Sequence, residues 1–344
     1  MNLSEEASKL RHKWNDLARL IFHTGRRLVS QKPMAERVDM TAKNVIITGG
    51  ARQSIGYEVA KTLAAWGAHV TVTSLEDVEP LQQALHSDLQ EMPGKDSSYE
   101  RRVVARHMNL CDPRSVADFV AWYGSNHERL HVLVNNAGVF KDIAGLSKTP
   151  ILSDDGIEIH WRTNFLGTFH LTSLLLPMLA ETGRLTGDAR VVITSSHVYE
   201  DGRNELFFSE EPEDYKSWRS YSQAKLALVH LSFEIQRRYA KEYNLQSVVL
   251  HPGSVRTNLT SSGLDGNPAL KAVHRLFEPA LAPFFLKLEH GAQTTITCAT
   301  KSPIEGGRYY ERCAVAEASE QANDEAVAKR LWEMADGWVS GLSV

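Results

Sequence analysis

A tyrosine and a lysine stand four residues apart in the stretch YSQAK (221–225), inside a segment with a helical pattern. Residues at this spacing share one face of a helix. The ammonium group of Lys225 would favour ionisation of the Tyr221 phenol, so we expect the tyrosine pKa to fall from about 10 toward working pH. Such a phenol can take a proton from an alcohol or give one to a developing alkoxide. The pair alone is weak evidence, because an exposed surface pair would have the same spacing.

Three further motifs precede this pair in a fixed order. VNNAG (134–138) and ITSSHVY (193–199) each end a strand-like run, and TNFLGTF (163–169) lies within a helical pattern. Singly, each could be a turn or a strand-end cap. Together, the ordered set resembles the short-chain dehydrogenase/reductase superfamily, from about residue 43 to at least residue 257. The resemblance implies an NAD(P)(H)-dependent oxidoreductase that interconverts an alcohol and a carbonyl by hydride transfer.

The resemblance assigns roles to four residues. Tyr221 is the implied acid/base, and Lys225 is its implied partner. Ser196 would hold the substrate oxygen by a hydrogen bond, whereas the preceding Ser195 would be buried. Asn164 is carried over as the fourth member, relaying protons from Lys225 through water.

A glycine-rich stretch, TGGARQSIG (48–56), follows the first strand-like run and opens a helical one. The simple family pattern T-G-x-x-x-G-x-G has a middle glycine that lets the backbone approach a pyrophosphate. Here Gly49 and Gly56 match, but the loop is one residue longer and Ser54 precedes Ile55. This variant is similar to loops of some reductases in the superfamily. Ser54 suits a helix N-cap, and its hydroxyl could alternatively face a phosphate.

The choice between NADP(H) and NAD(H) depends on the end of the second strand, where an acidic residue would bind the ribose hydroxyls of NAD. By count that place falls at Ser74, which is small and neutral and would not repel a 2′-phosphate. Arg52 could pair with that phosphate. Glu76 and Asp77 could instead favour NAD(H), or be helix-start acids. We favour NADP(H) and keep NAD(H) as the alternative.

Further cofactor contacts are implied by the resemblance. Asn109 and Leu110 would flank the adenine, and the NNAG motif would line the ribose side. The segment HPGSVRTNL (251–259) would hold the carboxamide. The complete set of implied cofactor residues is Gly49, Arg52, Ser54, Ile55, Gly56, Ser74, Asn109, Leu110, Asn136, Ala137, Gly138, Tyr221, Lys225, Pro252, Gly253, Val255 and Thr257.

Short β-branched runs alternate with longer helical patterns from residue 43 onward. Continuous apolar strands separated by helices indicate a doubly wound parallel sheet with helices on both faces, that is, a single α/β Rossmann domain over residues 41–344. A ligand is expected at the carboxyl ends of the strands. The expected strands are 44–48, 69–73, 102–105, 131–135, 190–194 and 246–251, and the expected helices are 55–66, 112–124, 156–180, 220–240 and 291–299.

Three segments stand outside this alternation. Residues 1–40 have apolar residues at spacings of three and four and a basic complement, which predicts an amphipathic helix. Its first 30 residues would lie on a membrane surface, or pack on the domain or on a second subunit in a homodimer. Residues 200–217 form an acidic insertion. Residues 260–290 are apolar on one side, which predicts lid helices over a hydrophobic substrate, or else core or dimer contacts.

Composition excludes several classes of protein. The chain has 344 residues, is 42% hydrophobic and 23% charged, and carries a net charge of −4, so nothing favours nucleic-acid binding. No apolar run is long enough to span a membrane, and the N-terminus does not resemble a signal peptide. The three cysteines are widely spaced, which indicates neither a disulfide framework nor a metal site. We therefore expect a cytoplasmic protein, peripherally membrane-associated if the N-terminal helix binds lipid.

The C-terminal segments HGAQTTITCAT (290–300), GGRYYERC (306–313) and LWEMADGWV (331–339) are similar to the retinol dehydrogenase, WW-domain oxidoreductase and polyprenal reductase-like branch. That resemblance, with the apolar lid, implies a steroid, retinoid, isoprenoid, fatty or aromatic substrate. Two alternatives remain open. One is a non-catalytic NAD(P)-binding scaffold or sensor, and the other is an epimerase or dehydratase that also uses a YxxxK pair.

Overall fold

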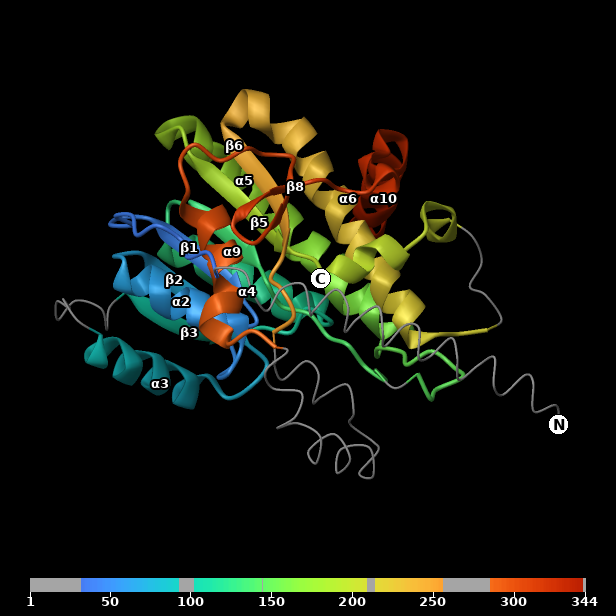
Figure 1. Ribbon diagram of the computed structural model, residues 1–344, viewed down its shortest axis with the longest axis horizontal. Coiled ribbons are helices and arrows are strands. Elements are labelled where there is room, and N and C mark those ends of the chain that lie inside the picture. The colour runs from blue at the N-terminus through green and yellow to red at the C-terminus, as the bar shows by residue number, and fades with distance from the viewer. Residues whose placement is uncertain (1–31, 93–101, 144, 209–213, 256–284, 343–344) are drawn as a thin grey trace.

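The computed structural model describes residues 32–92, 102–143, 145–208, 214–255 and 285–342. Its described residues form one eight-stranded sheet with helices around it (Figure 1). The strand order is β3-β2-β1-β4-β5-β6-β7-β8; all neighbours are parallel except β7 and β8. The strands are β1 (Asn44–Thr48), β2 (His69–Ser74), β3 (Val103–His107), β4 (Val132–Asn135), β5 (Ala189–Thr194), β6 (Leu245–His251), β7 (Tyr309–Glu311) and β8 (Ala314–Ala316). The doubly wound α/β prediction is confirmed.

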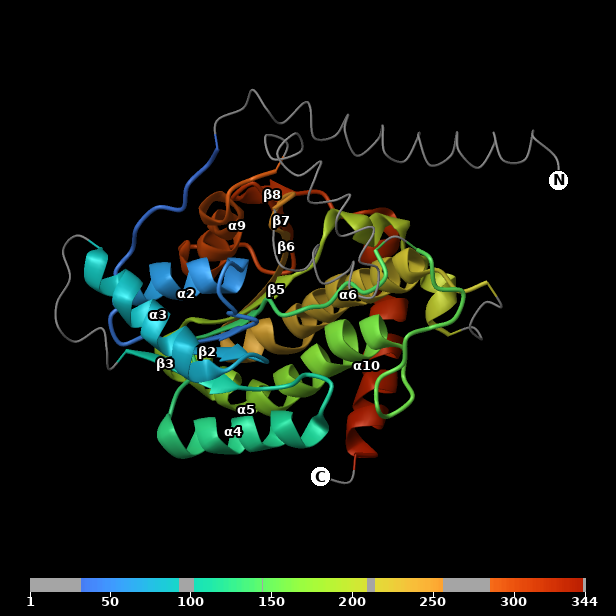
Figure 2. The same cartoon turned by 90° about the horizontal axis from the view of Figure 1, so that it is seen from below.

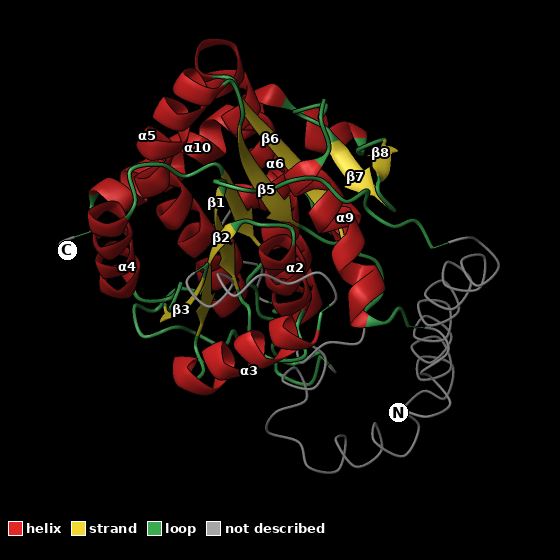
Figure 3. Cartoon of the chain, turned by 90° about the vertical axis from the view of Figure 1, so that its left-hand side faces the viewer, coloured by secondary structure: helices red, strands yellow, loops and turns green. Residues whose placement is uncertain are grey.

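Helices cover both faces of the sheet (Figure 2). The α-helices are α2 (Ile55–Ala65), α3 (Val78–Glu91), α4 (Pro113–Asn126), α5 (Thr168–Thr186), α6 (Ser217–Tyr243), α9 (Leu288–Thr300) and α10 (Glu325–Ser340). Helices α2, α3 and α9 pack on one face, α4, α5 and α6 on the other, and α10 packs against α6 and α5. Strands β7 and β8 lie at one edge of the sheet, near α9 (Figure 3).

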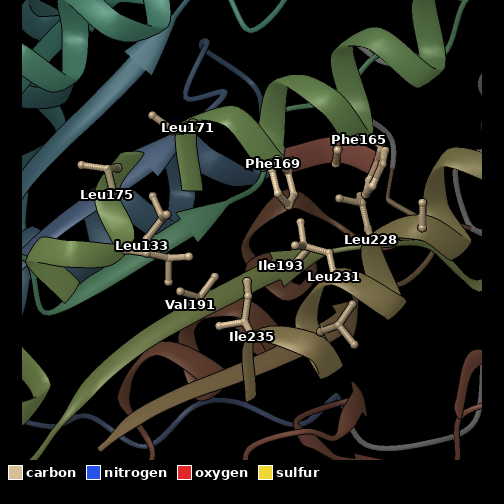
Figure 4. Close-up of a cluster of buried hydrophobic side chains, with 14 of the residues drawn as sticks. Leu133, Phe165, Phe169, Leu171, Leu175, Val191, Ile193, Leu228, Leu231 and Ile235 are labelled. Carbon is tan, nitrogen blue, oxygen red and sulfur yellow. The ribbon is translucent and has the colours of Figure 1, made fainter. Parts of the chain in front are cut away.

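Each central strand is buried on both faces, which explains its continuous apolar sequence. Within β1, Val45 and Ile47 belong to the core under α2, α3 and α9, whereas Ile46 belongs to the opposite core. Figure 4 shows that opposite core, where residues of α5 and α6 meet residues of β4 and β5. Phe165, Phe169, Leu228 and Leu231 are all at most 5% exposed there.

Several helices begin at a capping residue a few positions after the end of a strand. Ser54 caps α2 by accepting a hydrogen bond from the amide of Tyr57, and Asp112 caps α4, whose first residue is Pro113. These caps hold short loops at the carboxyl edge of the sheet. The same edge is where a ligand is expected in this fold class.

The structure departs from the predicted elements in several places. Helices α3 and α10 and strands β7 and β8 were not predicted. The helix expected over residues 156–180 begins at residue 159 and contains a π-helical turn, η2 (Trp161–Gly167), before α5. Within the acidic insertion, the described residues include parts of two short 3₁₀ turns, η3 (His197–Asp201) and η4 (Asn204–Phe207). A third, η6 (Glu320–Asn323), precedes α10.

The amphipathic helix predicted in residues 1–40 falls mostly outside the described residues, as does most of the lid predicted at 260–290. Both stay predictions, as do the domain boundaries. Within the described ranges, no helix combines the length and the apolar character that crossing a membrane requires.

Candidate active site

A cavity of about 400 Å³ opens along the carboxyl ends of the parallel strands. It extends from the loop after β1, past the ends of β2 and β3, to the ends of β4, β5 and β6. The order of the strands reverses between β1 and β4, and this switch point is the usual ligand crevice of a doubly wound sheet. The lining residues are Gly49, Ala51, Ser54, Ile55, Thr73, Ser74, Leu75, Glu76, Met108, Asn109, Leu110, Asn136, Ala137, Gly138, Val139, Thr163, Thr194, Ser195, Ser196, Tyr221, Lys225, His251, Pro252, Gly253 and Val255.

The glycine loop after β1 leaves no room for side chains at two of its glycines. Gly49 has φ +72°, and a Cβ there would lie 2.7 Å from the Cα of Ala137. A Cβ on Gly56 would collide with the carbonyl oxygen of Gly49 and lie 2.7 Å from Nδ2 of Asn136. The absence of Cβ atoms therefore lets the loop pack tightly against the NNAG turn and against itself, and of these two glycines only Gly49 lines the cavity.

Ser54 takes the place of the missing middle glycine. Its Oγ accepts from the amide of Tyr57 at 3.1 Å and donates to the carbonyl of Gly49 at 3.1 Å. The predicted N-cap is thus confirmed, and the serine closes the lengthened loop on itself. Arg52 is exposed in this loop, and the described cavity lining does not include its side chain.

Four hydrogen bonds join the ends of β1 and β4. Thr48 Oγ1 accepts from the amides of Asn136 and Ala137, at 3.0 and 2.9 Å. The Asn136 side chain donates back to the carbonyls of Thr48 and Gly49, at 2.9 and 3.1 Å. These hydrogen bonds hold the NNAG turn against the glycine loop. The role of Thr48 in joining the two was not predicted from the sequence.

At the end of β2, Ser74 is buried, and its Oγ accepts from the amide of Glu76 at 3.0 Å. Leu75 and Glu76 follow it, exposed on the cavity wall. Asn109 and Leu110 face the same end of the cavity from the loop after β3. This end offers a neutral serine together with one nearby carboxylate.

Ser196 and Tyr221 meet at the other end of the cavity. Burial raises the pKa of the Tyr221 phenol, and a hydrogen bond with Ser196 partly opposes that rise. Ser195, by contrast, is buried and donates from Oγ to the Lys225 carbonyl at 2.8 Å. The structure therefore gives the two serines the different surroundings that the resemblance implied.

Lys225 lies beside Tyr221, with Nζ 5.6 Å from the centre of the phenol ring, and donates to the carbonyl of Thr194 at 3.1 Å. Burial lowers the pKa of Lys225 to about 8. The expectation of a lowered tyrosine pKa is wrong, because burial raises it. Removal from water dominates both groups, and it disfavours the charged form of each.

Asn164 lies in the π-helical turn η2 and is fully buried behind the cavity wall. Its Oδ1 accepts from the amide of Val139 at 2.7 Å, and its Nδ2 donates to the Val139 carbonyl at 2.9 Å. A Cβ on Gly138 would lie 3.1 Å from Asn164 Oδ1 and 3.6 Å from Lys225 Nζ. Gly138 therefore lets the asparagine and the lysine approach the same point.

The segment after β6 closes this end of the cavity. Pro252, Gly253 and Val255 line it as predicted, and Gly253 has φ +91°. Thr257 lies outside the described residues. The lining also includes two residues with no predicted contact, Val139, which follows the NNAG motif, and His251, which begins the segment HPGSVRTNL.

Taken together, the described residues fit a nicotinamide dinucleotide. The glycine loop places Gly49, Ser54 and the first residue of the capped helix α2 at the cavity, where backbone amides can bind a phosphate. The reactive side chains Ser196, Tyr221 and Lys225 meet at the far end of the cavity. Hydrogen-bond donors there can contact a substrate oxygen beside a nicotinamide ring.

The comparisons with known proteins agree with this geometry. The sequence profile described as short chain dehydrogenase matches residues 43–267. The chain is 32% identical over 312 residues to retinol dehydrogenase 11 of Homo sapiens, covering 90% of this chain and 89% of that protein. It is 34% identical over 304 residues to retinol dehydrogenase 14 of Mus musculus, covering 86% of each. It is 31% identical over 308 residues to the WW domain-containing oxidoreductase of Gallus gallus, covering 87% of this chain and 68% of that protein.

Solved structures share the fold. A crystal structure of an uncharacterised protein from Mycobacterium paratuberculosis aligns with a TM-score of 0.62 at 26% identity, covering 89% of this chain and 96% of that one. A short chain dehydrogenase from Shigella flexneri aligns with a TM-score of 0.59 at 19% identity, covering 82% and 97%. The second match carries information about the fold alone.

Proposed function

The chain belongs to the short-chain dehydrogenase family, in a branch that resembles the retinol dehydrogenases, and from this premise we propose that Tyr221 is the acid/base of its reaction. The protein is an NAD(P)-dependent oxidoreductase that acts on alcohols and carbonyls. The observation that best supports the proposal is the meeting of Ser196, Tyr221 and Lys225 at one end of the cavity.

A bound nicotinamide would supply or accept the hydride. Ser196 and Tyr221 would hold the substrate oxygen by hydrogen bonds, which orients the carbonyl carbon. During reduction, Tyr221 gives its proton to the developing alkoxide, and the raised pKa of the phenol keeps that proton available at neutral pH. The Lys225 ammonium, whose Nζ is 5.6 Å from the centre of the Tyr221 ring, would then stabilise the phenolate that remains.

The proposed substrate is a hydrophobic alcohol or carbonyl compound, because two of the relatives named above are retinol dehydrogenases. The test is reduction of a panel made of all-trans-retinal, decanal and a steroid ketone, followed by loss of NADPH or NADH absorbance. Turnover of at least one panel member by the wild type is expected, together with its loss in Tyr221→Phe and a large reduction in Ser196→Ala. Undiminished turnover by Tyr221→Phe would refute the assignment.

The proposed cofactor is NADP(H). Ser74 is neutral where a ribose-binding acid would stand, and Arg52 lies exposed in the glycine loop. Glu76 on the cavity wall favours NAD(H) instead, because a carboxylate there would repel the 2′-phosphate of NADP(H). A fluorescence titration with NADPH and NADH separates these effects. We expect tighter NADPH binding, weakened about tenfold by Arg52→Ala and strengthened by Glu76→Gln. Equal wild-type affinities would refute the preference.

A non-catalytic scaffold is the first alternative function. Intact Ser196, Tyr221 and Lys225 argue against it, and turnover of any panel member would exclude it. A sugar-nucleotide epimerase or dehydratase is the second alternative. Calorimetric binding of a UDP-sugar would favour that function, and the absence of binding together with panel turnover would exclude it.

A further inference from the structure

An acid–histidine pair is buried next to Tyr221 but outside the cavity lining. Glu158 and His160 have side chains only 5% and 0% exposed, and Nδ1 of His160 lies 2.7 Å from Oε1 of Glu158. The same Oε1 accepts from the hydroxyl of Tyr215 at 3.0 Å, and Oε2 accepts from the amide of Trp161 at 2.9 Å. The carboxylate is thus satisfied on both oxygens.

The hydrogen bonds also define which ring nitrogen of His160 carries the proton. Nε2 lies 2.9 Å from the amide nitrogen of Lys141, which can only donate, so Nε2 is the acceptor. The proton of the neutral ring therefore sits on Nδ1 and is donated to Glu158. In this way Glu158 holds both the tautomer and the orientation of His160.

His160 in turn holds the short segment that follows the NNAG turn. Besides the His160–Lys141 contact, Asn164 binds both backbone groups of Val139, and Ser217 Oγ donates to the Asp142 carbonyl at 2.6 Å. Three separate contacts therefore fix residues 139–142.

Phe140 lies in the middle of this segment and contacts the tyrosine directly. Its ring stacks on the Tyr221 ring, with centroids 4.2 Å apart and an interplanar angle of 5°. The His160 ring packs edge-on against both, at 5.7 Å from Phe140 and 5.8 Å from Tyr221. One face of the Tyr221 ring is therefore covered by a side chain whose backbone His160 restrains.

From these contacts we propose that Glu158 and His160 are positioning residues for Tyr221, which act by holding Phe140 against its ring. This inference rests on the proposed role of Tyr221 as acid/base. Proton transfer needs the phenol oxygen within hydrogen-bond reach of the substrate oxygen and of Ser196. A displacement of about 1 Å can lower a rate about a hundredfold.

Stability of the fold alone would not require a buried carboxylate–histidine pair. Removing a carboxylate from water is costly, and an apolar side chain of similar volume would often stabilise a buried site as well or better. The pair gives directional hydrogen bonds to Lys141, Trp161 and Tyr215, which an apolar core would not supply. Orientation of the 139–142 segment is the property that these bonds provide.

The first test removes the stacked ring. In Phe140→Leu the site keeps an apolar side chain but loses the aromatic face, and we expect kcat to fall about tenfold or more while the Kd for NADPH is unchanged. In alcohol oxidation Tyr221 must be deprotonated to take the proton, so its pKa sets the acidic limb of the pH profile. Leucine keeps the apolar cover that raises this pKa, whereas a displaced phenol loses the opposing hydrogen bond with Ser196, so we expect the acidic limb to move to higher pH. Phe140→Tyr keeps a ring and should restore kcat to within about threefold of wild type.

The second test acts on the pair itself. Glu158→Gln should lower kcat and shift the pH profile in the same direction as Phe140→Leu, because an amide cannot accept on both ends. Glu181→Gln is the matched control, because Glu181 is an exposed residue paired with Arg184, and its kcat and pH profile should equal those of the wild type. The substrate in all assays is the panel member with the highest turnover.

Two results would overturn the inference. One is unchanged kcat and pH profile in Phe140→Leu. The other is a joint loss of NADPH affinity and thermal stability with no shift of the pH profile, which would show a structural role alone. If Glu158→Gln fails to fold, the comparison of Phe140→Leu with Phe140→Tyr decides the question. Tyr221→Phe is measured in parallel: its turnover would refute the proposed function, whereas its inactivity with an unaffected Phe140→Leu would refute only the positioning role.

Discussion

Replacing Lys225 by methionine should make the ligand-free protein more stable while abolishing its activity. The lysine is buried, and its pKa of about 8 lies well below its ordinary value of 10.5. Each pKa unit of difference corresponds to about 1.4 kcal/mol, so at pH 7 the charged lysine destabilises the folded state by about 3 kcal/mol. Methionine has a similar length and no charge to desolvate.

One hydrogen bond would be lost in this variant. Lys225 Nζ donates to the carbonyl of Thr194, and its removal costs about 1 kcal/mol. The net expectation at pH 7 is therefore an increase of about 2 kcal/mol in the free energy of unfolding. The gain has a specific pH dependence. Between about pH 8 and 10.5 the unfolded wild type binds more protons than the folded one, so its stability rises with pH and the difference from the variant disappears.

The assay is urea unfolding of both proteins at pH 7 and pH 10, without cofactor. Lys329→Met is the matched control, because that side chain is 68% exposed and its replacement should change stability by less than about 0.5 kcal/mol at either pH. A Lys225→Met variant that is less stable than wild type at pH 7 would refute the reasoning. A stability difference that does not change with pH would refute it equally.

Three other substitutions test separate parts of the structure. Gly56→Ala places a methyl group against the Gly49 carbonyl and should weaken NADPH binding at least about tenfold in a fluorescence titration. Gly124→Ala, in an open helical position, should leave the affinity unchanged, and equal affinities of the two variants would contradict the tight packing at Gly56. Burial lowers the pKa of His230 to about 4. As the pH falls from 6.5 to 4, the unfolding free energy of the wild type should therefore decrease by about 3 kcal/mol more than that of His230→Gln. Equal pH dependence of the two proteins in urea unfolding would contradict this. Gly337→Ala in α10 meets no atom within 4 Å and should raise the unfolding free energy by about 0.5–1 kcal/mol; a decrease would show a hidden constraint.

Local patterns were enough to predict the sheet and the edge where its site lies. The central strands β1, β4, β5 and β6 are buried on both faces, and their continuous apolar runs identify them. The spacing of Tyr221 and Lys225 also places them on one face of α6 whatever surrounds them. The N-cap role of Ser54 depends only on the residues next to it.

Other features depend on contacts between distant segments. The pKa of Tyr221 is set by removal from water, which the YxxxK spacing does not encode. The Glu158–His160 pair gains its meaning from Phe140 and Tyr221, which come from other segments of the chain. Strands β7 and β8 have only three residues each and form by pairing at the edge of the sheet.

Helix α3 is a different case, because its signal was present in the sequence. Leu81, Leu85 and Leu89 recur every four residues on its buried face, and Asp77 caps its start. The remaining positions are mostly polar, which hid a narrow apolar stripe. The π-helical turn that carries Asn164 had no such local marker.

In the proposed reaction, Tyr221 and Ser196 assist hydride transfer to a carbonyl carbon in this cavity. The test uses NADPH, and in parallel NADH, carrying deuterium at both C4 positions. Each is mixed with the best carbonyl substrate of the panel, and the product alcohol is measured by mass spectrometry. With the wild type we expect one deuterium on the carbinol carbon, and with Tyr221→Phe none, although that variant still binds the cofactor. Deuterium transfer by Tyr221→Phe at the wild-type rate would contradict the proposed role of Tyr221.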